Sequence, residues 1–260
     1  NNLVPANYKN VSSAKLCTTL ENSHGAKVST VEHLLAALYI AEIDNAVIEI
    51  DNEEVPIMDG SAIDFLNILN KTGIITLTKK RKYLKILDKV ELTDGERKIS
   101  IEPNEMSFEV EFQLNYENKI IGKQRNFINF QNDNIDDVSK SRTFCLFEDI
   151  EKIKKIGLAK GGSLKNAVVV DQDKVLNDGG LRNKKEFVNH KILDLAGDFL
   201  LSGYRVLGKI DCYQGGHELT NMFLKKLLDF KSAYTSIELE DAVMSKKTSS
   251  YQSIKVAVNA

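Results

Sequence analysis

The chain has 260 residues, of which 42% are hydrophobic and 28% charged, and its formal net charge is −2. This composition is typical of a globular protein with one large domain or two small ones. The near-neutral charge argues against nucleic-acid binding through bulk positive charge. Three cysteines are too few for a disulfide framework and are consistent with a reducing cytoplasm. The sequence contains no run of about 18 apolar residues, so it predicts no membrane-spanning helix.

The first part of the chain predicts two helices. Thr30 is expected to cap a helix over Val31–Ile40, because a threonine hydroxyl accepts an otherwise unpaired N–H at a helix start. Asn45–Asp51 is apolar and β-branched enough for a strand, and a turn at Pro56–Gly60 leads to a second helix over Ala62–Asn70. The other expected elements are a short strand at Leu16–Leu20, a turn at Asn22–Gly25 and an extended run at Ile74–Thr78.

The charge cluster Lys79–Lys82 is interpreted as the boundary between two domains, residues 1–79 and 83–260, with a solvated loop as the alternative. Strand-like runs follow it, and helices return later, so an α+β fold with helices packed on sheets is predicted. Residues 231–260 have weak patterning and are expected to be partly mobile. The expected strands are Tyr83–Leu92, Lys98–Ile101, Phe108–Leu114, Ile120–Phe130, Val168–Val170 and Val206–Asp211. The expected helices are Ile135–Lys140, Glu148–Ile156, Phe187–Ser202 and His217–Leu228.

The helix predicted over Phe187–Ser202 carries the first candidate chemistry. His190 and Asp194 are four residues apart, so they lie one turn apart on the same face. An imidazole and a carboxylate placed in this way can be two ligands of one divalent metal, with zinc as the first candidate. Asp198 continues the same line by another turn. The pair alone is a weak signal, because short motifs of this kind often occur by chance.

The chain has four histidines, and the three besides His190 differ in how strongly their surroundings indicate a functional role. His24 lies in a turn and is best explained as an exposed turn residue. His33 follows Glu32 in a helix apolar enough to be buried, where charged side chains are rare unless they are paired or bind metal; on this segment alone a hydrogen-bonded structural histidine is preferred. His217 follows Gly215-Gly216, which indicates a plain loop or a close approach of substrate to the backbone.

Considered together, His33, His190 and Asp194 would form a three-ligand set with one open position, as in catalytic zinc sites. Iron(II) stays open as an alternative, because two histidines and one carboxylate also bind that ion. The open position would hold a water whose pKa the metal lowers to about 7. Such a site hydrolyses amides or esters.

Acid and base groups for this hydrolysis are also present. Glu32, next to one proposed ligand, could take the proton of the water, and His217 could protonate a leaving amine with Asp198 orienting it. Thr143 could donate a hydrogen bond to a developing oxyanion, although a helix-capping role is equally favoured. Lys191 is a candidate phosphate contact, with a solvated lysine as the alternative. The glycine-rich loop at residues 157–163 matches no nucleotide-binding fingerprint.

A series of motifs also occurs in a recognisable order: S-T-V-E-H-L-L-A-A-L, E-V-P-I-M-D-G-S-A, S-R-T-F, G-L-A-K-G-G-S, L-N-D-G-G-L-R, E-F-V-N-H-K-I-L-D-L-A-G-D and G-G-H-E-L-T-N. Through them the chain resembles the UDP-3-O-acyl-N-acetylglucosamine deacetylases, zinc enzymes of the committed step of lipid A synthesis in Gram-negative bacteria. The resemblance runs from about Leu16 to Leu228. It implies a two-domain fold, each domain a layer of helices on a sheet, with the active site between the domains.

The resemblance also implies roles for individual residues. The implied zinc ligands are His33, His190 and Asp194. The implied proton-transfer residues are Glu32 as general base, His217 as general acid or electrostatic partner, and Asp198 as the support of His217. The implied substrate-side residues are Thr143 at the oxyanion, Phe144 near the nucleotide, Lys191 near its phosphate, and Cys17, which matches a cysteine near the zinc that is not a required ligand. The passage for the acyl chain would be built around Ile120–Gly122.

Three departures from the family pattern stand out. By motif alignment the chain lacks the amino-terminal part of the family's first domain, so that domain is expected to expose an apolar face and to be destabilised. We therefore expect the natural chain to be longer. Glu218 replaces the small residue that usually follows the last histidine, and Cys145 stands where glycine is usual after T-F.

The leading hypothesis is zinc-dependent hydrolysis of the acetamide of UDP-3-O-(3-hydroxyacyl)-N-acetylglucosamine, which releases acetate. The expected protein is a cytoplasmic monomer that binds a UDP-sugar lipid precursor and no nucleic acid. One alternative is a zinc amidase with another acylated substrate, which a substrate panel would distinguish. The other is a sugar-nucleotide-binding relative without catalysis, for which a zinc content near zero would be evidence.

Overall fold

The computed structural model describes residues 2–155, 157 and 159–239. The described helices are α1 (Glu32–Ile40), α2 (Ile63–Thr72), α3 (Asp136–Ser139), α4 (Ile150–Lys155), α5 (Glu186–Leu200) and α6 (His217–Asp229). The strands of the large sheet are β4 (Arg81–Ile86), β5 (Val90–Asp94), β6 (Arg97–Glu102), β7 (Phe108–Asn115), β8 (Lys123–Asn129), β12 (Arg205–Tyr213) and β13 (Tyr234–Leu239). Two small sheets contain β1 (Val11–Ser13), β2 (Thr19–Glu21) and β3 (Lys27–Val28), and β9 (Phe144–Leu146), β10 (Val168–Asp171) and β11 (Lys174–Val175).

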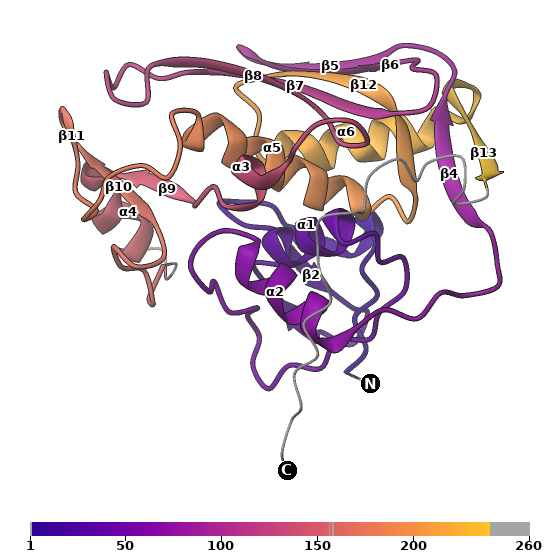
Figure 1. The fold of residues 1–260 in the computed structure, drawn as a ribbon, viewed down its shortest axis with the longest axis horizontal. Coiled ribbons are helices and arrows are strands. Elements are labelled where there is room, and N and C mark those ends of the chain that lie inside the picture. Colours follow the sequence, from indigo (N-terminus) through magenta and orange to yellow (C-terminus); the bar gives the residue numbers. More distant parts are fainter. Residues whose placement is uncertain (1, 156, 158, 240–260) are drawn as a thin grey trace.

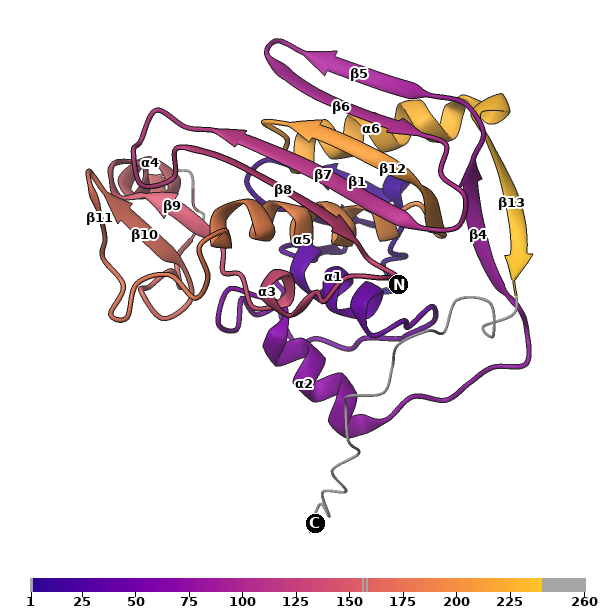
Figure 2. The same cartoon turned by 45° about the horizontal axis from the view of Figure 1, so that its top comes forward.

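Strand β12 is the centre of the large sheet. It pairs parallel with β4 at its start, antiparallel with β6 further on, and parallel with β7. Ile210 in β12 lies opposite Ile101 and Val110, and all three side chains are fully buried. A strand with apolar neighbours on both sides is typical of the middle of a covered sheet. The hairpin formed by β5 and β6 extends over α6, as Figure 2 shows.

Helices α5 and α6 lie under the large sheet, and α1 and α2 lie on the far side of α5 (Figure 1). Helix α5 is therefore covered by the sheet on one side and by α1 on the other. Thirteen of its fifteen residues are buried, including the polar residues His190, Asp194 and Asp198. Polar groups buried this deeply need partners, so the middle of α5 is the first candidate for a functional site.

The α+β class, with helices packed on sheets, is confirmed. Most expected elements form within a few residues of their predicted ends, but the expected strand Tyr83–Leu92 is two strands, β4 and β5. Between the two strands, the backbone N–H groups of Leu87 and Asp88 both donate to the carbonyl of Ala233. Strand β13 corrects the expectation of weak structure after residue 230, and residues 240–260 lie outside the described residues.

Two other expectations were wrong. The Thr30 hydroxyl does not cap α1; it donates to Glu54, and Val31 precedes the helix without a side-chain cap. The run Asn45–Asp51 forms no strand, and Val47 is 83% exposed. Its residues have the propensity for a strand, but among the described residues no neighbouring strand pairs with it, and a strand needs a partner for its backbone groups. The run at Ile74–Thr78, expected to be extended, belongs to no helix or strand and is exposed.

Candidate metal centre and active site

Gly197 determines how closely α1 and α5 can approach. A Cβ atom at this position would lie 2.2 Å from the carbonyl oxygen of Glu32 and 3.0 Å from the backbone nitrogen of Ala36. Real Cβ atoms do not approach backbone atoms so closely, so only glycine permits this helix crossing. The crossing places the first turn of α1, with Glu32 and His33, against the face of α5 that carries the other polar residues.

The three predicted metal ligands converge at this crossing. The Nε2 atom of His190 lies 3.3 Å, and that of His33 3.5 Å, from Oδ1 of Asp194. The three ligand atoms all lie within 4.8 Å of one another, and all three residues are buried. The rings of His33 and His190 meet edge to face with centroids 5.0 Å apart. His33, which precedes His190 by 157 positions, thus forms one compact cluster with His190 and Asp194 of α5.

The chemistry of these atoms fits a divalent cation. Oδ1 of Asp194 is buried and has no hydrogen-bond partner among the described residues, a costly state that a bound metal would relieve. The Nδ1 atom of His190 lies 3.0 Å from the carbonyl of Ser141. A carbonyl oxygen only accepts, so Nδ1 carries the proton and the lone pair of Nε2 faces the cluster, the arrangement usual for a metal-binding histidine.

The protonation states of these ligands also suit metal binding. Burial lowers the pKa of His190 to about 3, so its ring is neutral at pH 7. Burial would raise the pKa of Asp194, but His190 and Lys191 hold it well below its usual value. A neutral imidazole and an ionised carboxylate are the forms that bind metals.

Lys191 and Phe144, the predicted substrate contacts, lie at the edge of this cluster. The Lys191 ammonium donates to Oδ2 of Asp194 at 3.0 Å and lies 5.7 Å from the centre of the Phe144 ring. Burial opposes the charge of Lys191, but Asp194 raises its pKa. Phe144 packs against Phe187, with ring centroids 4.9 Å apart, and against His190. Lys191 is therefore held by the carboxylate of a predicted ligand.

The predicted acid and base lie next to the metal cluster. Nδ1 of His217 contacts Oδ2 of Asp198 at 2.8 Å, so its other ring nitrogen, Nε2, points into the site. That Nε2 lies 3.7 Å from Oε1 of Glu32 and 3.8 Å from Oδ2 of Asp194. His217 is the first residue of α6 and follows an extended Gly216. Gly215 packs closely against β12, since a Cβ there would lie 2.3 Å from the sulfur of Cys212, whereas a Cβ at Gly216 would meet no atom within 4 Å.

The pKa values of this pair are shifted towards their proposed roles. Burial raises the pKa of Glu32 from its ordinary 4.5, and the nearby histidines only partly offset this effect. Burial alone would lower the pKa of His217, but Asp198 and Glu32 raise it to about 9. His217 is therefore protonated near neutral pH. A buried carboxyl group and an imidazolium in contact are the combination expected where protons are transferred.

Of the other predicted residues, Thr143 and Cys17 lie near residues of the site, and His24 lies in an exposed turn. The backbone of Thr143 is fixed on both sides, since its N–H donates to Gly60 at 2.7 Å and its carbonyl accepts from Val168. Thr143 is thus held between Ser141, which contacts His190, and β9. Cys17 is half-buried, and burial and the charge of Glu32 raise its pKa. His24 is exposed in its turn, as expected.

Sequence reasoning missed three residues that support the site. Thr18 contacts two of the polar residues described above, Glu32 and Asp198. Arg142 and Glu186 form a buried ion pair with Nε and Oε1 2.8 Å apart, next to Ser141 and at the start of α5. Arg142 and Glu186 stand in the motifs S-R-T-F and E-F-V-N-H-K-I-L-D-L-A-G-D, but the motifs indicate no role for them, and Thr18 lies in none of the quoted motifs. Only the buried position of a charged or hydroxyl side chain identifies them, and burial depends on the fold.

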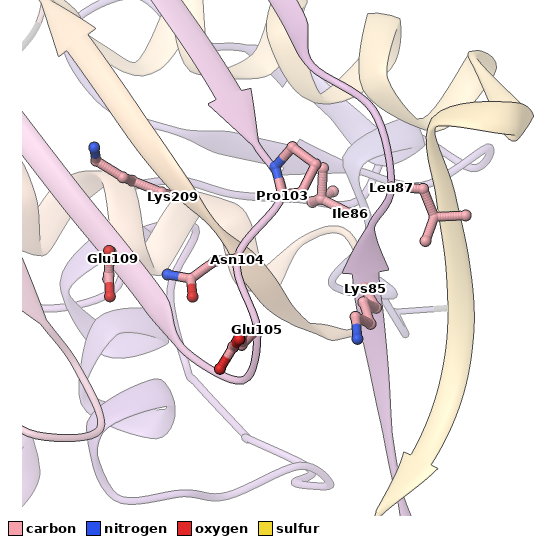
Figure 3. A pocket seen from close by; sticks show the side chains of 8 residues that line it. All are labelled: Lys85, Ile86, Leu87, Pro103, Asn104, Glu105, Glu109 and Lys209. Carbon is pink, nitrogen blue, oxygen red and sulfur yellow. The ribbon is translucent and has the colours of Figure 1, made fainter.

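The surface hollow shown in Figure 3 lies elsewhere. It is formed by the end of β4, the start of β7, the middle of β12 and the β6–β7 connection, and its lining includes Lys85, Pro103, Glu105 and Lys209. It contains none of the predicted site residues and is open to solvent. Among the described residues, no helix is both long and apolar enough to cross a bilayer.

Comparison with known proteins gives a consistent assignment. Residues 1–229 match the model of the LpxC family, described as UDP-3-O-acyl N-acetylglycosamine deacetylase. The chain is 39% identical over 236 residues to the UDP-3-O-acyl-N-acetylglucosamine deacetylase of Pseudoalteromonas translucida, covering 90% of this chain and 78% of that protein. It is 41% identical over 227 residues to the protein of the same name from Nautilia profundicola, covering 86% and 76%. On this evidence the chain belongs to the family of UDP-3-O-acyl N-acetylglycosamine deacetylases.

Proposed function

We propose that this chain hydrolyses the acetamide of UDP-3-O-acyl-N-acetylglucosamine, a step of lipid A synthesis, and releases acetate and the free amine. The observation that carries the proposal is the position of Glu32 and His217, a buried base and acid in contact, beside the His33–His190–Asp194 ligand set. The family membership supports the choice of substrate. One water is consumed: its oxygen goes to acetate, and its two protons are shared between the products.

The metal of this site is proposed to be zinc, held by Nε2 of His33, Nε2 of His190 and Oδ1 of Asp194. When bound, such a cation activates water and polarises the amide carbonyl as a Lewis acid. Iron(II) also suits two histidines and a carboxylate. Metal analysis of the purified protein distinguishes the two ions.

Glu32 is the proposed general base. Its Oε2 accepts a hydrogen bond from the backbone N–H of Thr18 at 3.0 Å, which leaves Oε1 directed towards His217. Glu32 takes one proton from the attacking water. Its raised pKa makes the ionised side chain a stronger base than an exposed glutamate.

His217 is the proposed general acid. The bond from Nδ1–H to Asp198 fixes the ring, and the second N–H, on Nε2, faces the site. The imidazolium stabilises the negative charge that develops on the amide oxygen and then donates its Nε2 proton to the leaving amine. Thr143 is proposed as a further donor to that oxygen. Phe144 and Lys191 are proposed contacts of the nucleotide and its phosphate, and Cys17 is proposed to border the substrate.

The test measures acetate release from UDP-3-O-acyl-N-acetylglucosamine by zinc-loaded protein. Glu32→Gln keeps the shape of the side chain but removes the base, so the turnover number is expected to fall by about 100-fold or more. Zinc content should stay unchanged, because Glu32 is not a ligand. Near-normal turnover in this variant would show that the base assignment is wrong, and absence of turnover in the zinc-loaded wild type would refute the proposed reaction.

We also propose a division into two domains, residues 1–79 and 83–260, and a monomer that works in the cytoplasm. The division is supported by the irregular segment before Arg81, where the first strand of the large sheet begins. The three free cysteines support a reducing compartment.

A further inference from the structure

Thr18 occupies an unusual position between the two ends of the proton-transfer system. It comes just before β2, and its side chain is almost completely buried, with 2% of the residue exposed. Its backbone N–H donates to Oε2 of Glu32 at 3.0 Å. Its hydroxyl Oγ1 donates to Oδ1 of Asp198 at 2.7 Å. One residue therefore contacts the proposed base directly and contacts the proposed acid through Asp198.

The two oxygens of Asp198 have separate partners. Oδ1 accepts the Thr18 hydroxyl, and Oδ2 contacts Nδ1 of His217 at 2.8 Å. A carboxylate that is held at one oxygen cannot rotate freely, so the Thr18 bond keeps Oδ2 directed at the imidazole. Short bonds to an ionised group are stronger than neutral ones. The ring orientation of His217 thus depends on a hydroxyl that lies in a different part of the chain.

Hydrogen bonds also hold the backbone around Thr18. Its carbonyl accepts from the N–H of Val31, the residue that precedes Glu32, at 3.3 Å. The next three residues form β2, which pairs with β1 and β3 on its two sides. The backbone that carries the hydroxyl is therefore held in place by hydrogen bonds to α1 and by strand pairing. Because its two acceptors come from α1 and α5, Thr18 also connects the helices that carry the metal ligands.

We propose that Thr18 is a positioning residue, whose hydroxyl holds Asp198, and through it His217, in the geometry needed for proton transfer. This proposal rests on the proposed function of the site. It predicts that loss of the hydroxyl slows the chemical step, because His217 then samples orientations in which its second N–H no longer faces the substrate. Substrate affinity and metal binding involve other atoms and should be preserved.

The test compares zinc-loaded wild type with T18S and T18A, two variants that differ from each other by one oxygen. We expect T18A to lower kcat about ten-fold, with KM changed less than about two-fold. T18S keeps the donor and should recover most of kcat. If T18A fails to fold, Thr18→Val, with a methyl group in place of the hydroxyl, allows the same comparison with T18S.

Thr30 offers a matched control. Its hydroxyl also donates to a carboxylate, that of Glu54, at 2.9 Å, and it is also buried. T30A removes a bond of the same type from outside the proton-transfer groups and should leave kcat near the wild-type value. The proposal is overturned if T18A keeps wild-type kcat, if T18S is as impaired as T18A, or if T30A loses as much kcat as T18A.

A second readout is independent of turnover. A proton on Nδ1 of His217 bonded to Asp198 should give a downfield nuclear magnetic resonance signal in zinc-loaded wild type and in T18S. The signal should weaken or shift in T18A, with zinc content unchanged. An identical signal in all three proteins contradicts the positioning role. If the wild type shows the signal but releases no acetate, the proposed reaction fails while the hydrogen-bond network is still tested.

Discussion

The two ring nitrogens of His217 have different neighbours, and this difference sets the role of the residue. Nδ1 is paired with Asp198 inside the protein, while Nε2 faces Glu32 and Asp194 in the site. Three carboxylates around one imidazole stabilise its charged form, so the ring keeps its proton although it is buried. Burial leaves His190 neutral, because the carboxylate of Asp194 and the carbonyl of Ser141 offset the effect of burial only in part. Environment thus gives the two histidines the protonation states that suit their proposed roles, His217 as acid and His190 as metal ligand.

These shifts predict a bell-shaped dependence of kcat/KM on pH. Glu32 works as a base only when ionised, and its pKa is raised, so activity should fall as the pH drops through a value above 4.5. His217 works as an acid only when protonated, so activity should fall as the pH rises through about 9.

The pH prediction is checked by measuring kcat/KM of zinc-loaded protein across the range where the protein stays folded. His217→Gln should lower the rate at neutral pH and abolish the alkaline fall that belongs to the imidazole. An alkaline fall at the same pH in this variant would assign it to another group.

At the scale of elements, the crossing of α1 and α5 builds the site. Neither helix carries all three proposed metal ligands, and Gly197 lets the two backbones approach closely enough for the three side chains to meet. The far end of α1 is held as well, because Asp44 pairs with Arg81 of β4 at 2.8 Å and with Arg205 of β12 at 3.1 Å. Helix α1 is thus fixed at both ends against the larger part of the molecule.

Gly197→Ala should separate the two helices. The added methyl group would overlap the backbone at Glu32, so we expect a loss of about 1–3 kcal/mol in the free energy of unfolding and weaker metal binding. Urea unfolding and chelator competition measure the two effects.

Gly161→Ala is the matched control for Gly197→Ala, because a Cβ at Gly161 meets no atom within 4 Å. Gly161→Ala should change neither the free energy of unfolding nor the metal affinity. Wild-type stability and metal affinity in Gly197→Ala would show that α1 and α5 are not in close contact at this position.

At the scale of the whole molecule, the site joins segments that are distant in the chain. His33 comes from the first part, and His190 and Asp194 come from α5. Asp59 and Arg182 add a second link, with Oδ2 and Nη1 2.7 Å apart. A cation bound by both parts should therefore stabilise the folded chain as a whole, because a ligand that binds only the folded state shifts unfolding by mass action.

Removal of the metal should lower stability as well as activity. At free zinc about 1,000 times its Kd, the folded state gains about 4 kcal/mol, so the chelated protein should unfold at a clearly lower temperature. His33→Ala should abolish this zinc-dependent gain, whereas His24→Ala, which removes an exposed histidine, should retain it. Equal unfolding temperatures with and without zinc would contradict the shared site.

Much of the site followed from the sequence. The positions of His190, Asp194 and Asp198 follow from helical periodicity, a local property that a stretch of chain carries with it. The α+β class followed in the same way from the order of strand-like and helical runs. The ordered motifs are also sufficient to indicate the family, because they are a property of the sequence itself.

Only the tertiary structure decided the rest. It determined that Thr18 contacts Glu32 and Asp198, that Thr30 donates to Glu54 instead of capping α1, and that Asn45–Asp51 forms no strand. Each of these depends on a partner far away in the chain. Local propensity describes what a segment can form by itself, but hydrogen-bond partners and strand pairing depend on which segments the packed helices and sheets bring together.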